Sequence, residues 1–328
     1  MTAVPTELVD EEPQRSAAGG WEALLSRLSQ LSITKHFDAY ADVDWDSPEM
    51  RIDRDDPRWM LREDDPLGRT DWYRNLAPAE QAGLGLDLIA SKMKLGLQFE
   101  SILKQGLLRF AADLPNGSPE FRYCYHELIE EAQHSLMFQE FVNRSGFDAR
   151  GLTKLDRIGA AHVIRLARQF PELFFVFVLG GEDPIDHVQR RELRSGSVIH
   201  PLTERIMRIH VTEEARHLSF ARHYLKRRVP ALRRSRRAQL AVGAPLILAG
   251  MAQMMLRPSR QIVVKYRIPK AVLDEAYRKN PDHHAATIES LQKVRRLCEE
   301  LGLLSPAYKR LWRTLGLADG RPSASKQA

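Results

Sequence analysis

Apolar side chains recur every three or four residues along several long stretches of this chain, which is the pattern of helices that bury one face. The longest stripe predicts a helix over about Ala79–Ala112. Its apolar positions are Leu86, Ile89, Met93, Leu97, Leu103 and Leu107. Glu100 falls inside this stripe and not opposite it, so the helix is expected to carry a carboxylate into the core.

Three more long helices are expected before residue 228. The second follows Ser118, has Pro119 at its first position and ends before Gly146. The third runs through residues 171–193, where two glycines and Pro184 flank Glu182 and favour a kink or bulge. The fourth extends from about Pro201 to Arg228. The inward faces are expected to hold Cys124, Leu128, Glu131, His134 and Phe138 in the second helix, and Met207, His210, Glu214, His217, Ala221 and Tyr224 in the fourth.

The rest of the chain is organised around these four helices. Residues 1–20 are expected to be a disordered lead, and residues 318–328 a polar tail. Residues 21–317 are expected to form a single helical domain with its core bundle at about 79–228. Within it, residues 21–75 are irregular apart from a helix near Trp21–Leu31, and Asp42–Asp65 is a surface wrap. Further helices are predicted at about 238–257, 270–279, 283–301 and 305–315. With no alternating strand pattern, the fold class is all-α.

Composition supports an ordinary globular protein. Hydrophobic residues make up 43% and charged residues 28% of the chain. The two cysteines, Cys124 and Cys298, are far apart, which argues against a disulfide scaffold and against a cysteine-ligated metal. The N-terminus has no apolar core and begins acidic, so it does not resemble a signal peptide. We therefore expect a cytoplasmic protein.

The net charge of +6 is concentrated in two basic runs, Arg190–Arg194 and Lys226–Arg237. Such a run fits an anionic membrane surface, nucleic acid or an acidic partner, but a solvated helix end is the simpler explanation. No nucleic-acid-binding motif accompanies it, so no nucleic acid partner is expected. Ala238–Leu256 is apolar for nearly a membrane span; we expect a buried helix there, with peripheral membrane contact as the alternative.

The chemistry is indicated by a doubled phrase, EEAQH at Glu130–His134 and EEARH at Glu213–His217. In each copy a glutamate and a histidine stand three residues apart and leave the same helix face: Glu131 with His134, and Glu214 with His217. A lone glutamate precedes each pair at a nearly equal distance, Glu100 before the first and Glu182 before the second. One glutamate from each of two helices and Glu-x-x-His from two others is the layout of a four-helix bundle that binds two metal ions.

His210 extends this set, because it lies four residues before Glu214 and seven before His217 on the same helix face. A packed core histidine is the alternative for His210 alone. Imidazole and carboxylate together suit iron, or else manganese, better than calcium or magnesium. The predicted metal ligands are Glu100, Glu131, His134, Glu182, His210, Glu214 and His217.

Other polar side chains near the motifs receive lesser roles. Glu130 and Glu213 are expected to face solvent or to contact the ligands from outside, and Glu127 to accept a hydrogen bond from a ligand. His126 and His223 are expected to be surface or packing histidines. Pocket walls are expected from Leu97, Phe138 and Phe175, although core packing explains these three equally well.

The ordered ligand set, with its H-x-x-x-E-x-x-H element at His210–His217, resembles the AurF-like family of di-iron N-oxygenases, the p-aminobenzoate N-oxygenase type. The resemblance covers roughly Glu80–Arg228. It implies a ferritin-like bundle and a seven-ligand di-iron centre, with no catalytic residue beyond the ligands. It further implies O2 and a small arylamine as substrates and an external reductase or other electron donor, since the chain has neither a dinucleotide fingerprint nor an iron–sulfur motif. A homodimer is the default for such bundles.

Three alternatives remain at this level. The first is a di-iron hydroxylase or desaturase that acts on a C–H bond of a lipid-like or carrier-bound substrate. The second is a ferroxidase, which fits less well because the chain is much larger than a minimal cage-forming bundle. The third is a non-enzymatic helical protein with a basic binding surface.

Overall fold

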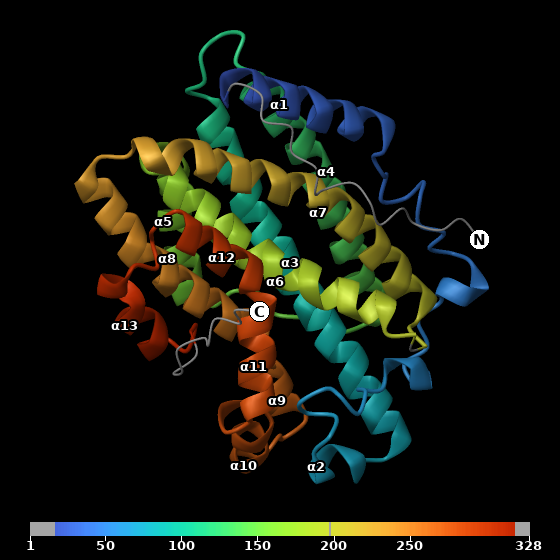
Figure 1. Ribbon diagram of the computed structural model, residues 1–328. Helices are drawn as coiled ribbons and strands as arrows, with labels where there is room; N and C mark the ends of the chain where they lie inside the picture. The colour runs from blue at the N-terminus through green and yellow to red at the C-terminus, as the bar shows by residue number, and fades with distance from the viewer. Residues whose placement is uncertain (1–16, 197, 319–328) are drawn as a thin grey trace, which may run out of the picture.

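Every element of secondary structure in the described part of the chain is helical (Figure 1). The computed structural model describes residues 17–196 and 198–318. Because these residues form no strand, the predicted all-α class is confirmed. Most of the predicted lead and tail, residues 1–16 and 319–328, lies outside the described residues. The first boundary was wrong: helix α1 (Ala17–Thr34) includes residues 17–20 and packs on the bundle through buried Trp21 and Leu25.

Four long helices form the bundle at the centre of Figure 1. They are α3 (Pro78–Ala111), α4 (Pro119–Ser145), α6 (Pro171–Arg194) and α7 (Pro201–Arg228). Each begins with proline, whose fixed φ suits the first helical position, where a backbone N–H has no partner to lose. Helix α3 packs mainly on α4 and helix α6 mainly on α7, and the two pairs meet face to face. The predicted four-helix bundle is thereby confirmed.

Helix α6 remains α-helical through its glycines and Pro184, so no π-bulge forms beside Glu182. The glycines instead allow neighbouring helices to approach. A Cβ at position 181 would lie 2.2 Å from the ring of Phe99 on α3, and one at position 180 would lie 2.8 Å from Leu248. The helices that carry Phe99 and Leu248 therefore pack closely against α6 next to Glu182.

An outer layer of helices covers α6. Helix α5 (Lys154–Gln169), which the sequence analysis missed, packs on α3 and α6, and α8 (Arg234–Met255) packs along α6. The remaining elements are η3 (Val229–Ala231), α9 (Arg260–Lys265), α10 (Lys270–Leu273), the π-helical turn η4 (Asp274–Arg278), α11 (Pro281–Ser290), α12 (Gln292–Glu300) and α13 (Pro306–Thr314). The expected burial of Ala238–Leu256 holds for one side only, because Val242 and Leu246 are exposed.

The segment between α1 and α3 wraps around the bundle as expected, but it is fastened by buried aromatic side chains. It contains η1 (Pro48–Met50), η2 (Pro57–Trp59) and α2 (Asp71–Arg74). Trp59 is buried, stacks on His200 at 4.0 Å between ring centroids and meets Phe141 edge-on. The wrap thus contributes to the core as well as to the surface.

Two apolar clusters fill the bundle at different levels. One is built from Phe99, Leu103, Phe175, Phe220 and their neighbours, together with α8 and α12. The other includes Met93, Phe138, Phe141 and Ile206, together with the N-terminal wrap. The predicted metal ligands lie in the sequence between the members of these clusters, so the polar site is enclosed by apolar packing above and below.

Candidate metal centre

The seven predicted ligand side chains converge inside the bundle. They come from all four helices: Glu100 from α3, Glu131 and His134 from α4, Glu182 from α6, and His210, Glu214 and His217 from α7. None is more than 1% exposed. Three overlapping groups each place their ligand atoms within 4.8 Å of one another: Glu100, His134 and His210; Glu131, Glu214 and His217; Glu182, His210 and Glu214. Among the described residues, these groups comprise the seven predicted side chains and no others.

The two Glu-x-x-His pairs meet at the centre of this set. Nδ1 of His217 lies 2.9 Å from Glu214 and 2.9 Å from Glu131. Nδ1 of His134 lies 3.1 Å from the other oxygen of Glu131 and 3.9 Å from Glu214. An imidazole nitrogen and a carboxylate oxygen that bind one ion at about 2.0–2.2 Å necessarily lie about 3 Å apart or more. The Nδ1 atoms are therefore spaced from the carboxylates as ligands of a shared ion would be.

His210 directs Nε2 toward the carboxylates, whereas His134 and His217 direct Nδ1 toward them. Its Nε2 lies 3.9 Å from Glu100, 3.8 Å from Glu182 and 4.0 Å from Glu214. Its Nδ1 lies 3.0 Å from the amide oxygen of Gln189 on α6. The Gln189 oxygen can only accept, so Nδ1 carries the proton and the lone pair of Nε2 points into the carboxylate group.

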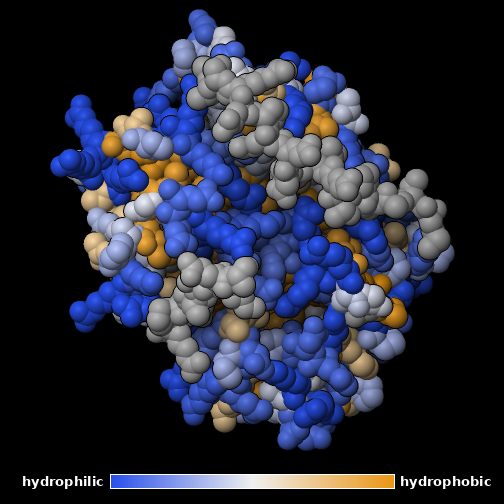
Figure 2. All heavy atoms as spheres, in the orientation of Figure 1, coloured by the Kyte–Doolittle hydropathy of each residue, from blue (hydrophilic) through white to orange (hydrophobic). Residues whose placement is uncertain are grey.

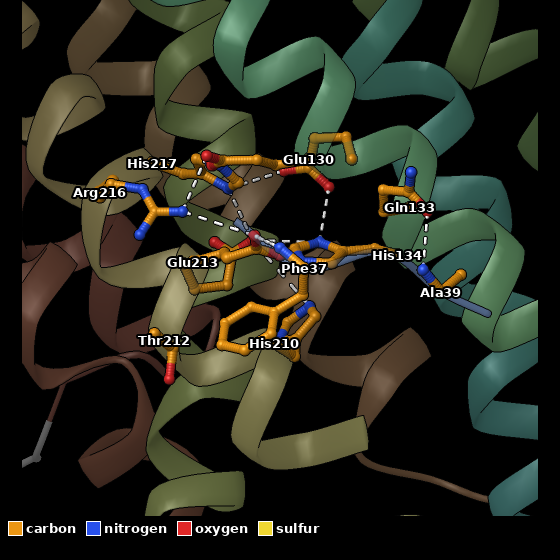
Figure 3. Close-up of polar contacts among 12 residues, drawn as sticks. Phe37, Ala39, Glu130, Gln133, His134, His210, Thr212, Glu213, Arg216 and His217 are labelled. Atoms are coloured by element: carbon orange, nitrogen blue, oxygen red, sulfur yellow. Dashed lines mark hydrogen bonds and ion pairs between the residues drawn. The ribbon is translucent and has the colours of Figure 1, made fainter. Parts of the chain in front are cut away.

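The first glutamate of each doubled phrase holds the histidine of the other phrase (Figure 3). Nε2 of His134 lies 2.9 Å from Glu213, and Nε2 of His217 lies 2.7 Å from Glu130. The guanidinium of Arg216 donates to Glu130 at 2.8 Å and lies 3.5 Å from Glu213. Both glutamates are buried, so the expectation that they face solvent was wrong, and the alternative of contact from outside the ligand set was right. These carboxylates fix the proton on Nε2 and leave Nδ1 toward the centre.

The electrostatics show a strong excess of buried negative charge. Burial, reinforced by Glu131 and Glu182, holds the pKa of Glu100 well above its usual value. Burial and the charges of Glu214 and Glu131 do the same to the pKa of Glu182. Burial works against a charged imidazole, yet Glu131 and Glu213 raise the pKa of His134 to about 9. Without metal, the site thus binds protons, which neutralise the carboxylates in place of a cation.

Unpaired buried oxygens show that these residues fit metal cations. Glu100 Oε2, both oxygens of Glu182 and Glu214 Oε2 are buried without a hydrogen-bond partner. A buried neutral polar group without a hydrogen bond costs roughly 2–7 kcal/mol by transfer scales, and an isolated ionised carboxylate costs far more. Divalent ions bound among four glutamates and three histidines would satisfy all of these oxygens, and mixed nitrogen and oxygen ligands suit iron or manganese.

Several functional contacts were not anticipated from the sequence. Gln189 on α6 orients His210. Arg216 on α7 bridges Glu130 and Glu213. Lys104, one turn after Glu100, donates to the backbone carbonyl of Glu131 at 2.9 Å and to the hydroxyl of Ser135. The repetition of the first glutamate in both phrases was the one sequence signal that could have identified the Glu130 and Glu213 contacts.

The N-terminal wrap closes the outer side of the site. The backbone N–H of Phe37 donates to Glu213 at 3.1 Å, and that of Ala39 donates to Gln133 at 2.8 Å (Figure 3). Gln133 occupies in the first phrase the position that Arg216 occupies in the second. The wrap therefore contacts both phrases, whereas only the second phrase also has an arginine at this position.

The lesser predictions had mixed outcomes. Glu127 is buried, but one of its oxygens has no partner and no hydrogen bond joins it to a ligand within the described residues, so its expected role was wrong. Burial raises its pKa to about 8. His126 and His223 are partly exposed and lie outside the three ligand groups.

Of the expected pocket walls, Phe138 lies against the site, with its ring centroid 5.5 Å from that of His210. Phe175 instead packs against Phe110 and Tyr224. Leu97 is partly buried beside the cluster that contains Phe138. Core packing therefore accounts for Phe175, whereas Phe138 borders the ligands.

Comparison with known proteins identifies a matching family and similar proteins from mycobacteria. The family described as P-aminobenzoate N-oxygenase AurF matches residues 20–302. An uncharacterized protein of Mycobacterium tuberculosis (strain CDC 1551 / Oshkosh) is 41% identical over 300 residues, which cover 92% of this chain and 88% of that relative. An uncharacterized protein of Mycobacterium bovis (strain ATCC BAA-935 / AF2122/97) has the same identity and coverage. No solved structure matches the chain significantly.

Proposed function

Since the chain belongs to the AurF family, described as P-aminobenzoate N-oxygenase, we propose that it is a di-iron oxygenase that uses O2 to oxidise the nitrogen of an arylamine. The observation that carries the proposal is the set of seven buried ligand-type side chains with carboxylate oxygens left unpaired. Iron bound at this site would supply the redox chemistry that activates O2. Both the arylamine substrate and the nitrogen as the oxidised atom are proposed here.

The ligand roles follow from which atoms face the centre. Glu131 and Glu214 lie between the two histidines of the doubled phrases and would hold metal there together with them. Glu100 on α3 and Glu182 on α6 approach on the side where His210 adds a third nitrogen. The four glutamates supply four negative charges, which offset two divalent ions.

The remaining residues hold protons and exclude water. Glu130 and Glu213 keep the protons of His217 and His134 on Nε2, and Gln189 keeps that of His210 on Nδ1. Each imidazole then presents its unprotonated nitrogen to the centre without rotating. The apolar clusters on both sides and Phe138 keep the site dry, which protects reactive oxygen from water. Electrons are proposed to come from an external donor.

The proposal is tested by loading the reduced protein with ferrous iron without air and counting the metal bound. Isotope-labelled O2 and p-aminobenzoate are then added, and products are analysed by mass spectrometry. We expect two iron ions per chain and a product that carries labelled oxygen on nitrogen. Glu204→Gln, on the exposed side of α7, serves as a control that keeps both results. A protein that binds no iron at micromolar concentrations would contradict the proposal.

A second candidate is oxidation of a C–H bond in a lipid-like substrate. It is favoured by one observation, the exposed apolar side chains Val242 and Leu246 beside the basic start of α8. The same assay distinguishes the two when a fatty-acyl substrate is offered in parallel. Labelled oxygen on carbon, or a new double bond, with no change in the arylamine would favour the second candidate. Loading with manganese under the same conditions tests the choice of metal.

A further inference from the structure

The oxygenase proposal leaves one large feature of the chain without a role. Between Glu214 and Asp274 the sequence has no aspartate or glutamate, but it has 14 lysines and arginines. This acid-free segment includes the end of α7, η3 and the whole of α8. Six of these side chains form ion pairs with carboxylates: Arg216, Arg222, Lys226, Arg228, Lys265 and Lys270. The arginines that remain form no ion pair within the described residues, and their excess of positive charge predicts an anionic partner.

The positive charge is strongest where α8 begins. Arginines occupy positions 233, 234, 236 and 237, and the first turn has no acidic residue. A helix start already has a partial positive charge from its free N–H groups, so a basic first turn opposes the helix dipole unless an anion is nearby. No acidic side chain compensates it: Arg233 and Arg234 have no carboxylate partner among the described residues, and Arg236 and Arg237 donate to backbone carbonyls of Gln169 and Leu301.

Two of these arginines, Arg233 and Arg236, border an open hollow on the surface. It has a volume of about 650 Å³ and is lined by Ala231, Leu232, Arg233, Ser235, Arg236 and Gln239. The helix N-terminus and two guanidinium groups at its rim provide donors suited to a phosphate group. The hollow is thus chemically matched to an anionic head group.

Apolar side chains continue the surface along α8. Val242 and Leu246 are 42% and 51% exposed, and both follow Ser235 and Gln239 along one side of the helix. The segment Arg234–Lys265 is long and apolar enough to cross a membrane by length and composition, but half of its most apolar stretch is buried within the molecule. Figure 2 shows apolar surface among hydrophilic side chains on the left, where α7 ends and α8 begins in Figure 1.

Helix α5 also carries exposed apolar side chains. It meets the start of α8 where Arg236 donates to Gln169 and covers the ring of Phe170. Its outer residues Leu155 and Ile158, near the other end of the helix, are 76% and 58% exposed, and Lys154 and Arg157 are their neighbours in the sequence. Two helices that cover α6 therefore both present apolar side chains next to arginines.

We propose that the surface made by Arg233, Arg234, Val242 and Leu246, called here the α8 face, docks reversibly on a membrane rich in anionic phospholipids. The arginines would contact lipid phosphates, and the two apolar side chains would enter the boundary with the acyl chains. An acidic protein partner would explain the charge but not the exposed apolar residues beside it, which is why a lipid surface is favoured. The proposal does not depend on the oxygenase reaction.

The test uses the full-length protein and vesicles in a flotation assay. One set contains phosphatidylcholine with phosphatidylglycerol, and the other contains phosphatidylcholine alone. We expect binding to the anionic vesicles, weakened by salt, and little binding to the neutral ones. Arg233→Ala with Arg234→Ala should weaken binding about thirtyfold, since each basic side chain near an anionic surface contributes about a fivefold factor. Leu246→Ser with Val242→Ser should also weaken binding severalfold, with all charges unchanged.

A matched control is Arg109→Ala with Arg122→Ala, which removes two exposed charges from the α3 and α4 side. The control should bind within about twofold of the unmodified protein, by the same short-range argument. Circular dichroism verifies that each variant is folded. Absence of binding to anionic vesicles at low salt would overturn the proposal, as would equal losses in the control and in the Arg233 and Arg234 variant. Binding that survives Leu246→Ser with Val242→Ser, together with capture of an acidic ferredoxin, would assign the α8 face to a protein partner instead.

Discussion

The contact between an outer imidazole nitrogen and a carboxylate of the opposite helix determines how the candidate ligands are presented. Glu213 holds His134, and Glu130 holds His217, so α4 and α7 each fix the other's histidine. The surroundings favour the charged form of Glu130. Although burial works against it, His217 and Arg216 hold the pKa of Glu130 at about 2. Loss of the negative charge from a carboxylate that holds a ligand histidine should therefore weaken metal binding.

Glu213→Gln is expected to weaken iron or cobalt affinity about 10–100-fold, the usual effect of removing a residue that orients a ligand histidine. The amide keeps the shape of the side chain, but it removes the charge and permits the wrong tautomer of His134. Isothermal titration with cobalt measures the affinity. Glu204→Gln changes the same charge on the exposed side of α7 and should leave affinity unchanged. Unaltered affinity in Glu213→Gln would show that the contact does not orient the ligand.

His210 is the residue on which the asymmetry of the site depends. Its Nε2 faces Glu100, Glu182 and Glu214, and burial with the nearby charge of His134 holds its pKa well below the usual value. The ring is therefore neutral and available as a ligand.

We expect His210→Gln to bind about one metal ion per chain at concentrations where the unmodified protein binds two, because only one of the two positions loses its nitrogen ligand. Elemental analysis after gel filtration measures the stoichiometry. His223→Gln, on the same helix but outside the ligand groups, should still bind two ions. Two tightly bound ions in His210→Gln would argue that His210 is only a core histidine.

At the residue scale, the sequence predicted which side chains meet but not how they are held. The i, i+3 spacing places Glu131 and His134 on one face whatever the rotation of the helix. Whether Glu130 turns outward or inward depends on the position of α7, and so does the contact with Arg216. Gln189 could not be predicted, since its role depends on α6 and α7 lying side by side.

At the element scale, long helices were predictable where one face alone is apolar. The predicted helix at Ala79–Ala112 corresponds to α3 at Pro78–Ala111, and the proline at the start of each bundle helix marks its beginning. Helix α5 was missed although its apolar residues recur at helical spacing and Thr153 with Asp156 forms a capping box at its start. Its outer side also carries exposed Leu155 and Ile158, and only Ala167 is fully buried.

Glycines in the helices allow a test of how closely the elements approach. A Cβ at Gly85 on α3 would lie 1.8 Å from the backbone carbonyl oxygen of Trp59 in the wrap, which cannot move aside as a side chain can. Gly85→Ala is therefore expected to lower the free energy of unfolding by about 1–3 kcal/mol, the usual range for overpacking. Gly250 on α8 has no atom within 4 Å of the added Cβ.

Gly250→Ala should raise the free energy of unfolding by about 0.5–1 kcal/mol, because alanine loses less backbone entropy than glycine in a helix. Urea denaturation of both variants measures the two effects under one set of conditions. A stabilising Gly85→Ala would mean that the wrap does not press on α3 at this position.

At the scale of the whole molecule, Asp87 links parts that are distant in the sequence. Its buried carboxylate accepts from Arg54 of the wrap at 2.8 Å and from Lys265 and Tyr266 beside α9 at 2.5 and 2.6 Å. Burial alone would raise the pKa of Asp87, but these three partners outweigh it and lower the pKa below 3.8. None of this was predictable, since the three partners come from segments without a sequence motif.

Asp87→Asn should lower the free energy of unfolding by about 1.5–3 kcal/mol, the range for hydrogen bonds to a charged group. Its pKa is depressed in the folded state, so its contribution is present above pH 3.8 and is lost as the pH falls below that value. The variant should therefore differ most from the unmodified protein at neutral pH and least in acid. Asp71→Asn, at an exposed pair with Arg74, should have almost no effect at either pH.

Removal of the metal should make the whole fold sensitive to alkali. In the metal-free protein the pKa values of Glu100, Glu182 and Glu214 are raised mainly by burial, and that of Glu127 is raised to about 8. A carboxyl with a raised folded-state pKa contributes stability that is present below its unfolded value of 4.5 and is lost as the pH rises through the folded value. His134 acts in the same direction, because its raised pKa of about 9 favours folding until its proton is lost. The metal-free protein should thus lose stability steadily between about pH 5 and pH 9.

Bound metal should reverse this trend, since ligands must lose their protons to bind it and an ion at about 100 times its Kd adds about 2.7 kcal/mol. Thermal unfolding of the metal-free and iron- or manganese-loaded protein at several pH values measures the difference, which should grow from acid to alkali. Glu127→Gln separates the contributions: it should flatten the metal-free profile near pH 8 without changing the metal stoichiometry, because Glu127 lies outside the ligand groups. A metal-free protein whose stability is constant across this range would mean that the buried carboxylates are neutralised by something other than protons or metal.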